Sequence, residues 1–182
     1  MKKIKLVTVL GTRPEIIRLS STLKKLDKYF NHTIINTNQN FDYELNKIFF
    51  KDLKLRKPEY FLNIINNNSI LAISDILTKV DKILKKIKPD AFLILGDTNS
   101  SISAFAAKRN KIPIFHIEAG NRCFDQNVPE EINRKIVDGL ADINLTYSQI
   151  SKQNLIAEGF NSDRVFAIGS PLKEVFEDNL SE

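Results

Sequence analysis

The segment "AFLILGDTNSSISAFAAKRNKIPIFHI", residues 91–117, decides the fold class. It begins with the apolar run Ala91–Leu95, continues through a helical stretch at Ser100–Arg109 and ends in a second apolar run, Ile112–Ile117. Short, nearly continuous apolar runs are typical of strands buried on both faces, and such strands run parallel when a helix connects them. The segment therefore predicts two parallel strands joined by a crossover helix.

The same alternation covers the rest of the chain. We expect further strands at Ile4–Leu10, His32–Thr37, Ile143–Tyr147 and Val165–Ile168. We expect further helices at Glu15–Tyr29, Tyr43–Phe50, Ser69–Ile87, Glu130–Leu140 and Ser151–Glu158, whereas Phe61–Ile65 is ambiguous. Apolar strands that alternate with amphipathic helices predict a doubly wound, Rossmann-like α/β fold with a parallel sheet covered on both faces.

The composition is that of one soluble globular domain. The chain has 182 residues, of which 42% are hydrophobic and 27% charged, an ordinary balance for such a domain. No apolar stretch approaches the roughly 20 residues that span a bilayer, so we expect no membrane partner. The first apolar run is interrupted by Lys5 and lacks a cleavage site, so it reads as a strand rather than a signal peptide. A single cysteine, Cys123, excludes an internal disulfide and favours a cytoplasmic location.

The charge balance is positive, with a formal net charge of +5. A positive balance suits a phosphate-bearing small substrate as well as nucleic acid. The basic residues lie in separate segments, and no aromatic RNA-binding signature accompanies them. We therefore expect no nucleic-acid partner.

Polar stretches follow four of the expected strands. They are "GTRPE" at 11–15, "NQN" at 38–40, "GDTNSS" at 96–101 and "EAGNRCFDQNVPEE" at 118–131. The carboxyl ends of parallel strands meet at one edge of the sheet, where ligands of such folds bind. We therefore expect these stretches to form one polar rim.

The stretch "GTRPE" combines a helix start with an unexpected cation. Gly11 permits a tight turn, and Thr12 with Glu15 can form a capping box. Arg13 is unfavourable for the helix dipole, but a cation beside free amides suits a phosphate. The stretch is not G-x-G-x-x-G, so a nicotinamide or flavin site is not supported.

Two carboxylates stand at strand ends. Asp97 either caps the next helix or points to the rim, because residues 99–100 can cap in its place. Glu118 either forms an ion pair with Arg122 or Arg134 or serves a site. Spacing alone leaves both choices open.

The stretch "NVPEEINR" starts a helix, with Asn127 as a cap and Glu130 in the first turn near the rim. Glu130–Arg134 and Glu131–Lys135 have the spacing of ion pairs. We expect Ile132, Ile136 and Leu140 to form the buried stripe of this helix.

Other reactive residues carry weaker signals. His116 lies within a strand and reads as a hydrogen-bonded core histidine, and Cys123 has no base placed to activate it. The carboxylates with a possible metal role are Asp97, Glu118, Asp125 and Glu130. They lack an EF-hand spacing, and no Cys/His cluster accompanies them, so we expect no metal.

These motifs, in this order, resemble those of the non-hydrolysing UDP-N-acetylglucosamine 2-epimerases. The matching stretches are "GTRPE", "NQNFDYEL" with Gln39, "LGDTNS", "HIEAGNR", "PEEINR" and "GSP" at 169–171. The forms "AGNRCFD" and "NQNFDYELN" look most similar to the capsule and O-antigen branch, which makes UDP-N-acetyl-L-fucosamine from the L-talosamine sugar. The family's usual "QH" pair reads Gln39-Asn40 here, which puts the sugar itself in doubt.

The resemblance implies an epimerase that removes the C2 proton, expels UDP and re-adds it after protonation of the other face. The implied acid/base residues are Asp97, Glu118 and Glu130. The implied substrate-binding residues are Arg13, Arg18, Gln39, Arg122 and Arg134. Arg13 would hold the diphosphate, Arg18 stands where the family often has lysine, and Arg122 and Arg134 would hold the carboxylates in place. No metal or other cofactor is implied.

The resemblance also implies a GT-B-like enzyme of two Rossmann-like domains, of which this chain matches only the first. We expect residues 1–170 to form that domain and 171–182 to begin the connection to a second domain, absent here, that completes the site. A homodimer is implied as well. Alternatives are a hydrolytic relative, a GT-B glycosyltransferase fragment, and a non-catalytic half-domain that binds a nucleotide or oligomerises.

Overall fold

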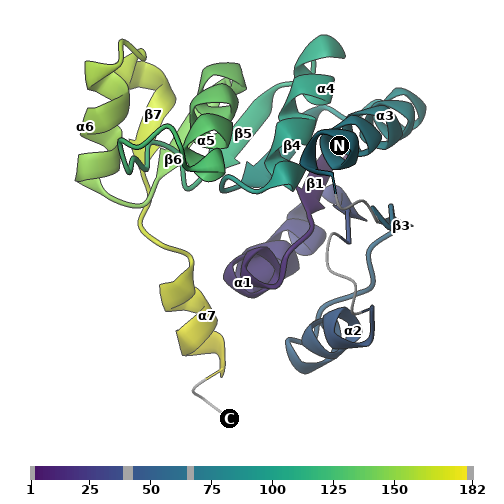
Figure 1. Ribbon diagram of the computed structural model, residues 1–182. Coiled ribbons are helices and arrows are strands. Elements are labelled where there is room, and N and C mark those ends of the chain that lie inside the picture. Colours follow the sequence, from purple (N-terminus) through teal and green to yellow (C-terminus); the bar gives the residue numbers. More distant parts are fainter. Residues whose placement is uncertain (1–2, 39–42, 65–67, 180–182) are drawn as a thin grey trace.

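The computed structural model describes residues 3–38, 43–64 and 68–179, with the backbone alone at 43–47 and 179 (Figure 1). The strands are β1 (Lys5–Leu10), β2 (Asn31–Asn36), β3 (Tyr60–Phe61), β4 (Ala91–Leu95), β5 (Ile114–Ile117), β6 (Ile143–Thr146) and β7 (Val165–Ala167). The helices are α1 (Arg13–Tyr29), α2 (Tyr43–Asp52), α3 (Ser69–Ile87), α4 (Ala104–Arg109), α5 (Pro129–Leu140), α6 (Gln149–Ala157) and α7 (Leu172–Asn179). Two 3₁₀ turns, η1 (Asn99–Ser103) and η2 (Ser162–Arg164), complete the elements.

The strands form one parallel sheet in the order β3-β2-β1-β4-β5-β6-β7. The chain runs outward from β1 to β3, returns to the centre at β4 and continues to the opposite edge at β7. The strand order therefore reverses between β1 and β4, and the crevice at their carboxyl ends is the usual ligand position of a doubly wound sheet. The predicted fold class is confirmed.

Helices cover both faces of the sheet (Figure 1). Helices α3, α4 and α5 pack on one face, and α1, α2 and α7 lie on the other. Alternate residues of β1 belong to the two hydrophobic cores, one on each face of the sheet. Val7 and Val9 pack on the α3 side, whereas Leu6 and Leu10 pack on the α1 side. Among the described helices, none is long and apolar enough to cross a bilayer.

The last helix, α7, packs on α1. Ser21 donates a hydrogen bond to Asp178 at 2.5 Å, and Lys25 pairs with Glu174 at 2.8 Å. Val175 is buried in this contact. The segment after β7 is therefore docked on the domain that precedes it.

Helix α5 differs from its sequence-based prediction. Ile132 and Ile136 are 49% and 43% exposed, so the predicted stripe is wrong at both positions, and only Leu140 packs against the core. The buried positions are Glu131, Asn133, Val137 and Asp138. This helix turns a polar face inward because, as shown below, those polar groups find partners in the rim loops. Asn127 is not the cap, since the N-cap position is Val128 and makes no side-chain bond.

Candidate functional site

Glu15 connects the turn after β1 with the turn after β4, at the place where the strand order of the sheet reverses. Its Oε2 accepts hydrogen bonds from the backbone N–H groups of Gly11 and Thr12, each at 2.7 Å, and its Oε1 accepts one from the Thr98 hydroxyl at 2.7 Å. Burial raises the pKa of Glu15, although these hydrogen bonds oppose the shift. The helix-starting role was predicted from the sequence, but the contact with the turn after β4 was not.

Arg13 lies beside this turn with an unmet hydrogen-bond donor. Its guanidinium carbon is 6.0 Å from the centroid of the Phe49 ring, which is within cation–π range. Its Nε is buried and has no hydrogen-bond partner within the described part of the chain. A buried N–H of a cation at the first turn of α1 suits an oxygen of an anionic ligand.

Glu118 ends β5 in a conformation that is unusual for a residue with a side chain. Its φ of +72° lies in the left-handed region, which is strained for glutamate and is found disproportionately at functional sites. Its Oε2 lies 2.6 Å from Nη1 of Arg18 on α1. The ion pair weighed from the sequence, with Arg122 or Arg134, therefore forms with Arg18 instead.

The charge environment of Glu118 is mixed. Burial raises the pKa of its carboxyl, the Arg18 cation opposes that shift, and the Asp97 anion adds to it. Leu95 of β4 pairs with Ile117 of β5, so Asp97 and Glu118 follow the ends of neighbouring strands.

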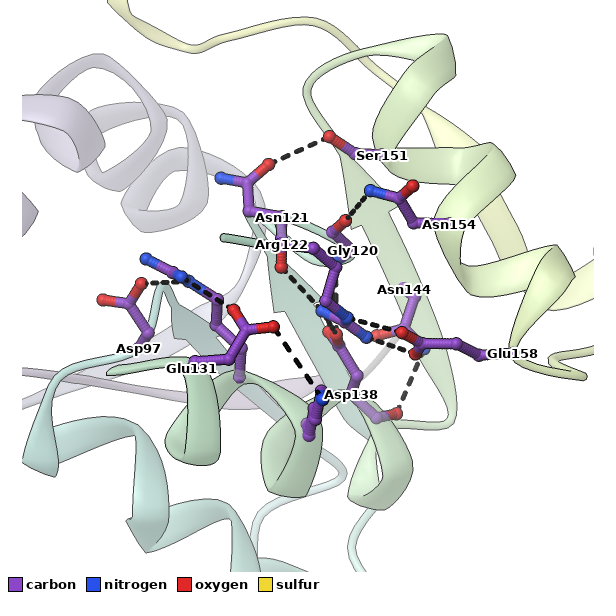
Figure 2. A network of polar contacts seen from close by, with 12 residues as sticks. Asp97, Gly120, Asn121, Arg122, Glu131, Asp138, Asn144, Ser151, Asn154 and Glu158 are labelled. Atoms are coloured by element: carbon purple, nitrogen blue, oxygen red, sulfur yellow. Dashed lines mark hydrogen bonds and ion pairs between the residues drawn. The ribbon is translucent and has the colours of Figure 1, made fainter. Parts of the chain in front are cut away.

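Asp97 is free of the capping role that the sequence left open. Thr98 caps the turn η1 through its hydroxyl, which accepts from the N–H of Ser100 at 3.2 Å. The Asp97 carboxylate, labelled in Figure 2, instead binds Nε of Arg134 at 2.6 Å. Asn133 donates to the Asp97 carbonyl at 2.8 Å. Two residues of helix α5 therefore hold the turn after β4 in place.

The two neighbouring glutamates of α5 have different environments. Glu131 is buried, and its Oε2 accepts from the N–H of Cys123 at 3.0 Å and from Arg134 at 3.1 Å. Burial would raise its pKa, but these hydrogen bonds outweigh burial and hold the pKa below its usual value. Glu130 is exposed in the first turn, and no ion pair joins it to Arg134 among the residues described. Glu131 therefore holds the loop, and Glu130 is free to meet a ligand.

Arg122 lies beneath the rim rather than on it. Its side chain is fully buried, with Nη1 2.8 Å from Asp138 and Nη2 2.5 Å from Glu158 (Figure 2). Its Nε donates to the second oxygen of Glu158 at 2.7 Å. This guanidinium already has carboxylate partners on two elements. Gln39, the remaining predicted binding residue, lies outside the described residues.

Three further residues belong to this region and carry no sequence signal that marks them. Asp138 binds Arg122 from the inner face of α5, at a position where the sequence suggested only helix packing. Glu158 ends α6. Tyr147 follows β6, and its hydroxyl is buried without a partner in the described chain. Burial raises the pKa of Tyr147, and the Glu118 charge adds to the shift.

Comparisons with known proteins agree on one family. A profile of the family described as UDP-N-acetylglucosamine 2-epimerase matches residues 24–182. A Methanocaldococcus jannaschii protein named UDP-N-acetylglucosamine 2-epimerase is 39% identical over 179 residues, covering 97% of this chain and 49% of that protein. A Pseudomonas aeruginosa protein named UDP-2,3-diacetamido-2,3-dideoxy-D-glucuronate 2-epimerase is 36% identical over 160 residues, covering 86% and 45%.

Solved structures give the same result. UDP-N-acetylglucosamine 2-epimerase from Rickettsia bellii superposes with a TM-score of 0.93 at 50% identity, over 98% of this chain and 48% of that one. The Methanocaldococcus jannaschii enzyme in complex with UDP-GlcNAc and UDP gives a TM-score of 0.93 at 40% identity, over 98% and 50%. A lipopolysaccharide galactosyltransferase, at 15% identity and a TM-score of 0.60, shares the fold alone. The chain therefore spans about half the length of the relatives it matches.

Proposed function

This chain belongs to the UDP-N-acetylglucosamine 2-epimerase family, and we propose from that premise that it supplies the sugar-facing half of a UDP-2-acetamido-sugar 2-epimerase. The reaction is elimination of UDP after removal of the C2 proton, followed by re-addition. The observation that carries the proposal is the position of Asp97 and Glu118 after the ends of the neighbouring strands β4 and β5, each bound to an arginine. Two carboxylates in one crevice provide the proton transfers that such a reaction needs.

The acid/base roles go to Asp97, Glu118 and Glu130. A raised pKa brings Glu118 nearer to neutrality, which suits a group that takes and returns a proton. Glu130 stands exposed at the first turn of α5, where the amide groups of a helix start favour negative charge. Elimination and re-addition of UDP proceed by proton transfer and departure of the diphosphate, so the proposed route has no hydride-transfer step that would need a redox cofactor.

The residues that we propose to bind the substrate or to hold the catalytic carboxylates for it are Arg13, Arg18, Gln39, Arg122 and Arg134. Arg13 offers its buried, unmet Nε to the diphosphate at the start of α1. Arg18 holds Glu118, whereas Arg134 holds Asp97. Arg122 acts from beneath, through Asp138, rather than by touching the sugar.

The substrate class is a UDP-2-acetamido sugar. UDP-N-acetylglucosamine with its manno epimer and the L-talosamine and L-fucosamine pair are the two substrate types that we propose. The relatives support the class, since one solved structure is a complex with UDP-GlcNAc and UDP and another relative is named for a diacetamido uronic acid. Capsule or O-antigen synthesis in the cytoplasm would use such a product.

A second domain completes the proposed site. Residues 1–170 form the first Rossmann-like domain, and 171–182 begin the connection, with α7 docked on α1. The support is the length of the relatives, of which this chain covers about half. A second candidate function is a non-catalytic nucleotide-binding or oligomerising domain, which the buried, unmet Nε of Arg13 would serve by binding an anion without proton transfer.

We propose that the protein forms a homodimer through one helical face. Helices α3, α4 and α5 lie side by side (Figure 1), and each leaves apolar side chains exposed. The α3–α5 apolar face consists of Ile70, Leu71, Phe105, Ile132 and Ile136. Apolar groups gathered on one face are typical of a subunit interface.

Deuterium exchange tests the proposed reaction. The chain is incubated in D2O with UDP-N-acetylglucosamine, and separately with the UDP-L-talosamine analogue, and the C2 proton is followed by NMR. The same assay is run after the chain is joined to the second half of a relative. We expect deuterium uptake by the completed enzyme and its loss in Asp97→Asn, Glu118→Gln and Glu130→Gln. Absence of uptake by the completed wild-type enzyme would favour the non-catalytic half-domain.

A further inference from the structure

A buried array of four charged residues lies directly beneath the two rim turns. We call His116, Asp138, Arg122 and Glu158 the buried array. His116 Nδ1 lies 2.9 Å from Asp138 Oδ1, and Arg122 Nη1 lies 2.8 Å from Asp138 Oδ2. Glu158 binds the far side of Arg122 (Figure 2). His116, Asp138 and Arg122 have fully buried side chains, whereas Glu158 reaches the surface at one end of the array.

The hydrogen bonds assign the protonation state of His116. Its Nε2 lies 2.9 Å from the carbonyl oxygen of Gly96, which can only accept, so Nε2 donates. The Asp138 carboxylate accepts from Arg122 and from the N–H of Gly120 at 3.3 Å, as an ionised carboxylate does. An ionised carboxylate cannot donate, so this geometry is satisfied when Nδ1 also carries a proton and donates to Asp138. In that state two cations and two anions balance in the array.

The array is bonded to both turns that carry the strand-end carboxylates. His116 holds the carbonyl of Gly96, the residue before Asp97. Asp138 holds the N–H of Gly120, two residues after Glu118. A single group of side chains thus spans the ends of β4 and β5.

The turn after β5 needs such support because its backbone is strained at Glu118, whose φ is +72°. Gly96 and Gly120 also have positive φ values, +73° and +75°, which glycine adopts without strain. A Cβ at Gly120 would overlap the backbone carbonyl of Ser151, so glycine alone fits there. Strained backbone persists only where the surroundings fix it, and the array bonds these turns from within.

We propose that His116 and Asp138 are positioning residues, which hold the Gly96–Asp97 and Glu118–Gly120 turns so that the two carboxylates keep the geometry needed for C2 proton transfer. The inference rests on the proposed epimerase function. Neither residue touches the sugar in this role. A buried ion pair contributes little net stability compared with apolar side chains of the same size, so a role in geometry accounts for the array better than a role in stability.

The first experiment needs no catalytic activity. The 182-residue chain, labelled with ¹⁵N at histidine, is studied by NMR, and the His116→Gln variant assigns the two imidazole rings. We expect both nitrogens of His116 to carry protons at pH 7.5, and we expect Asp138→Asn to leave a proton on Nε2 alone. A neutral ring in the wild-type chain would overturn the array as described.

The second experiment compares matched carboxylate-to-amide changes in the enzyme completed by a second half. Asp138→Asn removes the centre of the array, whereas Asp142→Asn makes the same change in a carboxylate outside the site, which pairs with Lys108 at 2.8 Å near the start of β5. We expect Asp138→Asn to lower kcat for C2 exchange at least about tenfold per folded molecule, with KM within about twofold, because misplaced catalytic groups cost rate rather than binding. We expect Asp142→Asn to stay within about threefold of the wild-type kcat.

His116→Gln provides a second variant, since it retains a donor for Gly96 and loses the donor for Asp138. An unchanged kcat in either folded variant overturns the positioning role, and so does failure of both to fold, which would assign the array to stability. If the completed wild-type enzyme shows no C2 exchange, both the proposed epimerase function and the positioning role of His116 and Asp138 in it are wrong. Normal wild-type exchange with an unchanged Asp138→Asn rate defeats the positioning role alone.

Discussion

Glu118 shows how far single residues can be predicted from the sequence. Its place at a strand end followed from the apolar run before it and from the small residues after it. Its partner could not be predicted, because Arg18 is 100 residues earlier in the chain and meets it only through the parallel order of β1, β4 and β5. The left-handed backbone of Glu118 carries no sequence signal either, since that region is normally left to glycine, asparagine or aspartate.

Removal of the Arg18 cation should shift the pH dependence of catalysis. Arg18 lowers the pKa of Glu118 against the larger effect of burial, so Arg18→Met raises that pKa further. A base with a higher pKa loses its proton at higher pH, and the acid limb of the kcat/KM profile therefore moves upward. We expect kcat/KM for C2 exchange in the completed enzyme to fall roughly tenfold at pH 6 and to recover partly at pH 8.5.

Lys25→Met on the same helix is the control, because Lys25 forms an exposed ion pair with Glu174 away from the rim. An acid limb that stays in place in Arg18→Met would show that Glu118 does not titrate in the rate-determining step. A limb that moves equally in the control would assign the effect to net charge.

At the scale of elements, the ends of helices and strands were predicted better than the faces that the helices bury. The helix Ser69–Ile87 and the strand Ala91–Leu95 form with the predicted bounds, because caps and apolar runs mark them locally. The segment 99–109 divides into a 3₁₀ turn and a helix, since Thr98 rather than a later residue caps it. The prediction of the buried face of α5 was wrong at Ile132 and Ile136. Hydrophobic periodicity assigns apolar residues to the core, and it cannot show that distant loops supply hydrogen-bond partners that allow polar residues to be buried instead.

The junction of α1 with the turn after β4 depends on one buried carboxylate, and its stability should depend on pH. The pKa of Glu15 is raised in the folded state, so the folded chain binds that proton more tightly than the unfolded chain does. The stabilising contribution is complete below the unfolded value near 4.5 and is lost as the pH rises through the folded pKa. Glu15→Gln removes this loss and can still accept from Gly11 and Thr12 and donate to Thr98.

We therefore expect Glu15→Gln to have a higher Tm than the wild-type chain at pH 7.5, with the difference closing near pH 4.5. Thermal unfolding followed by circular dichroism at several pH values measures it. Glu174→Gln, an exposed glutamate, should show no comparable pH-dependent difference. A difference that grows toward acidic pH would contradict the assigned direction of the Glu15 pKa.

At the scale of the whole molecule, the proposed subunit interface explains why Ile132 and Ile136 of α5 are exposed. The polar inner face of α5 serves the rim, so its apolar residues face outward beside Phe105 of α4. Two charges placed on the α3–α5 apolar face should prevent association, because a charge buried without a partner is strongly unfavourable. We expect Ile132→Asp/Ile136→Asp to convert a dimer into a folded monomer.

Light scattering coupled to size-exclusion chromatography measures this change as a halving of the mass at micromolar concentration. Ile150→Asp is the control, since Ile150 is 71% exposed on α6, outside the face, and the variant should remain a dimer. Circular dichroism would show that both proteins keep their helices. A wild-type chain that is monomeric at these concentrations, or a double variant that stays dimeric, would place the subunit contact elsewhere or in the second half of the enzyme. Retention of C2 exchange by the monomeric variant of the completed enzyme would further show that each site is built within one subunit.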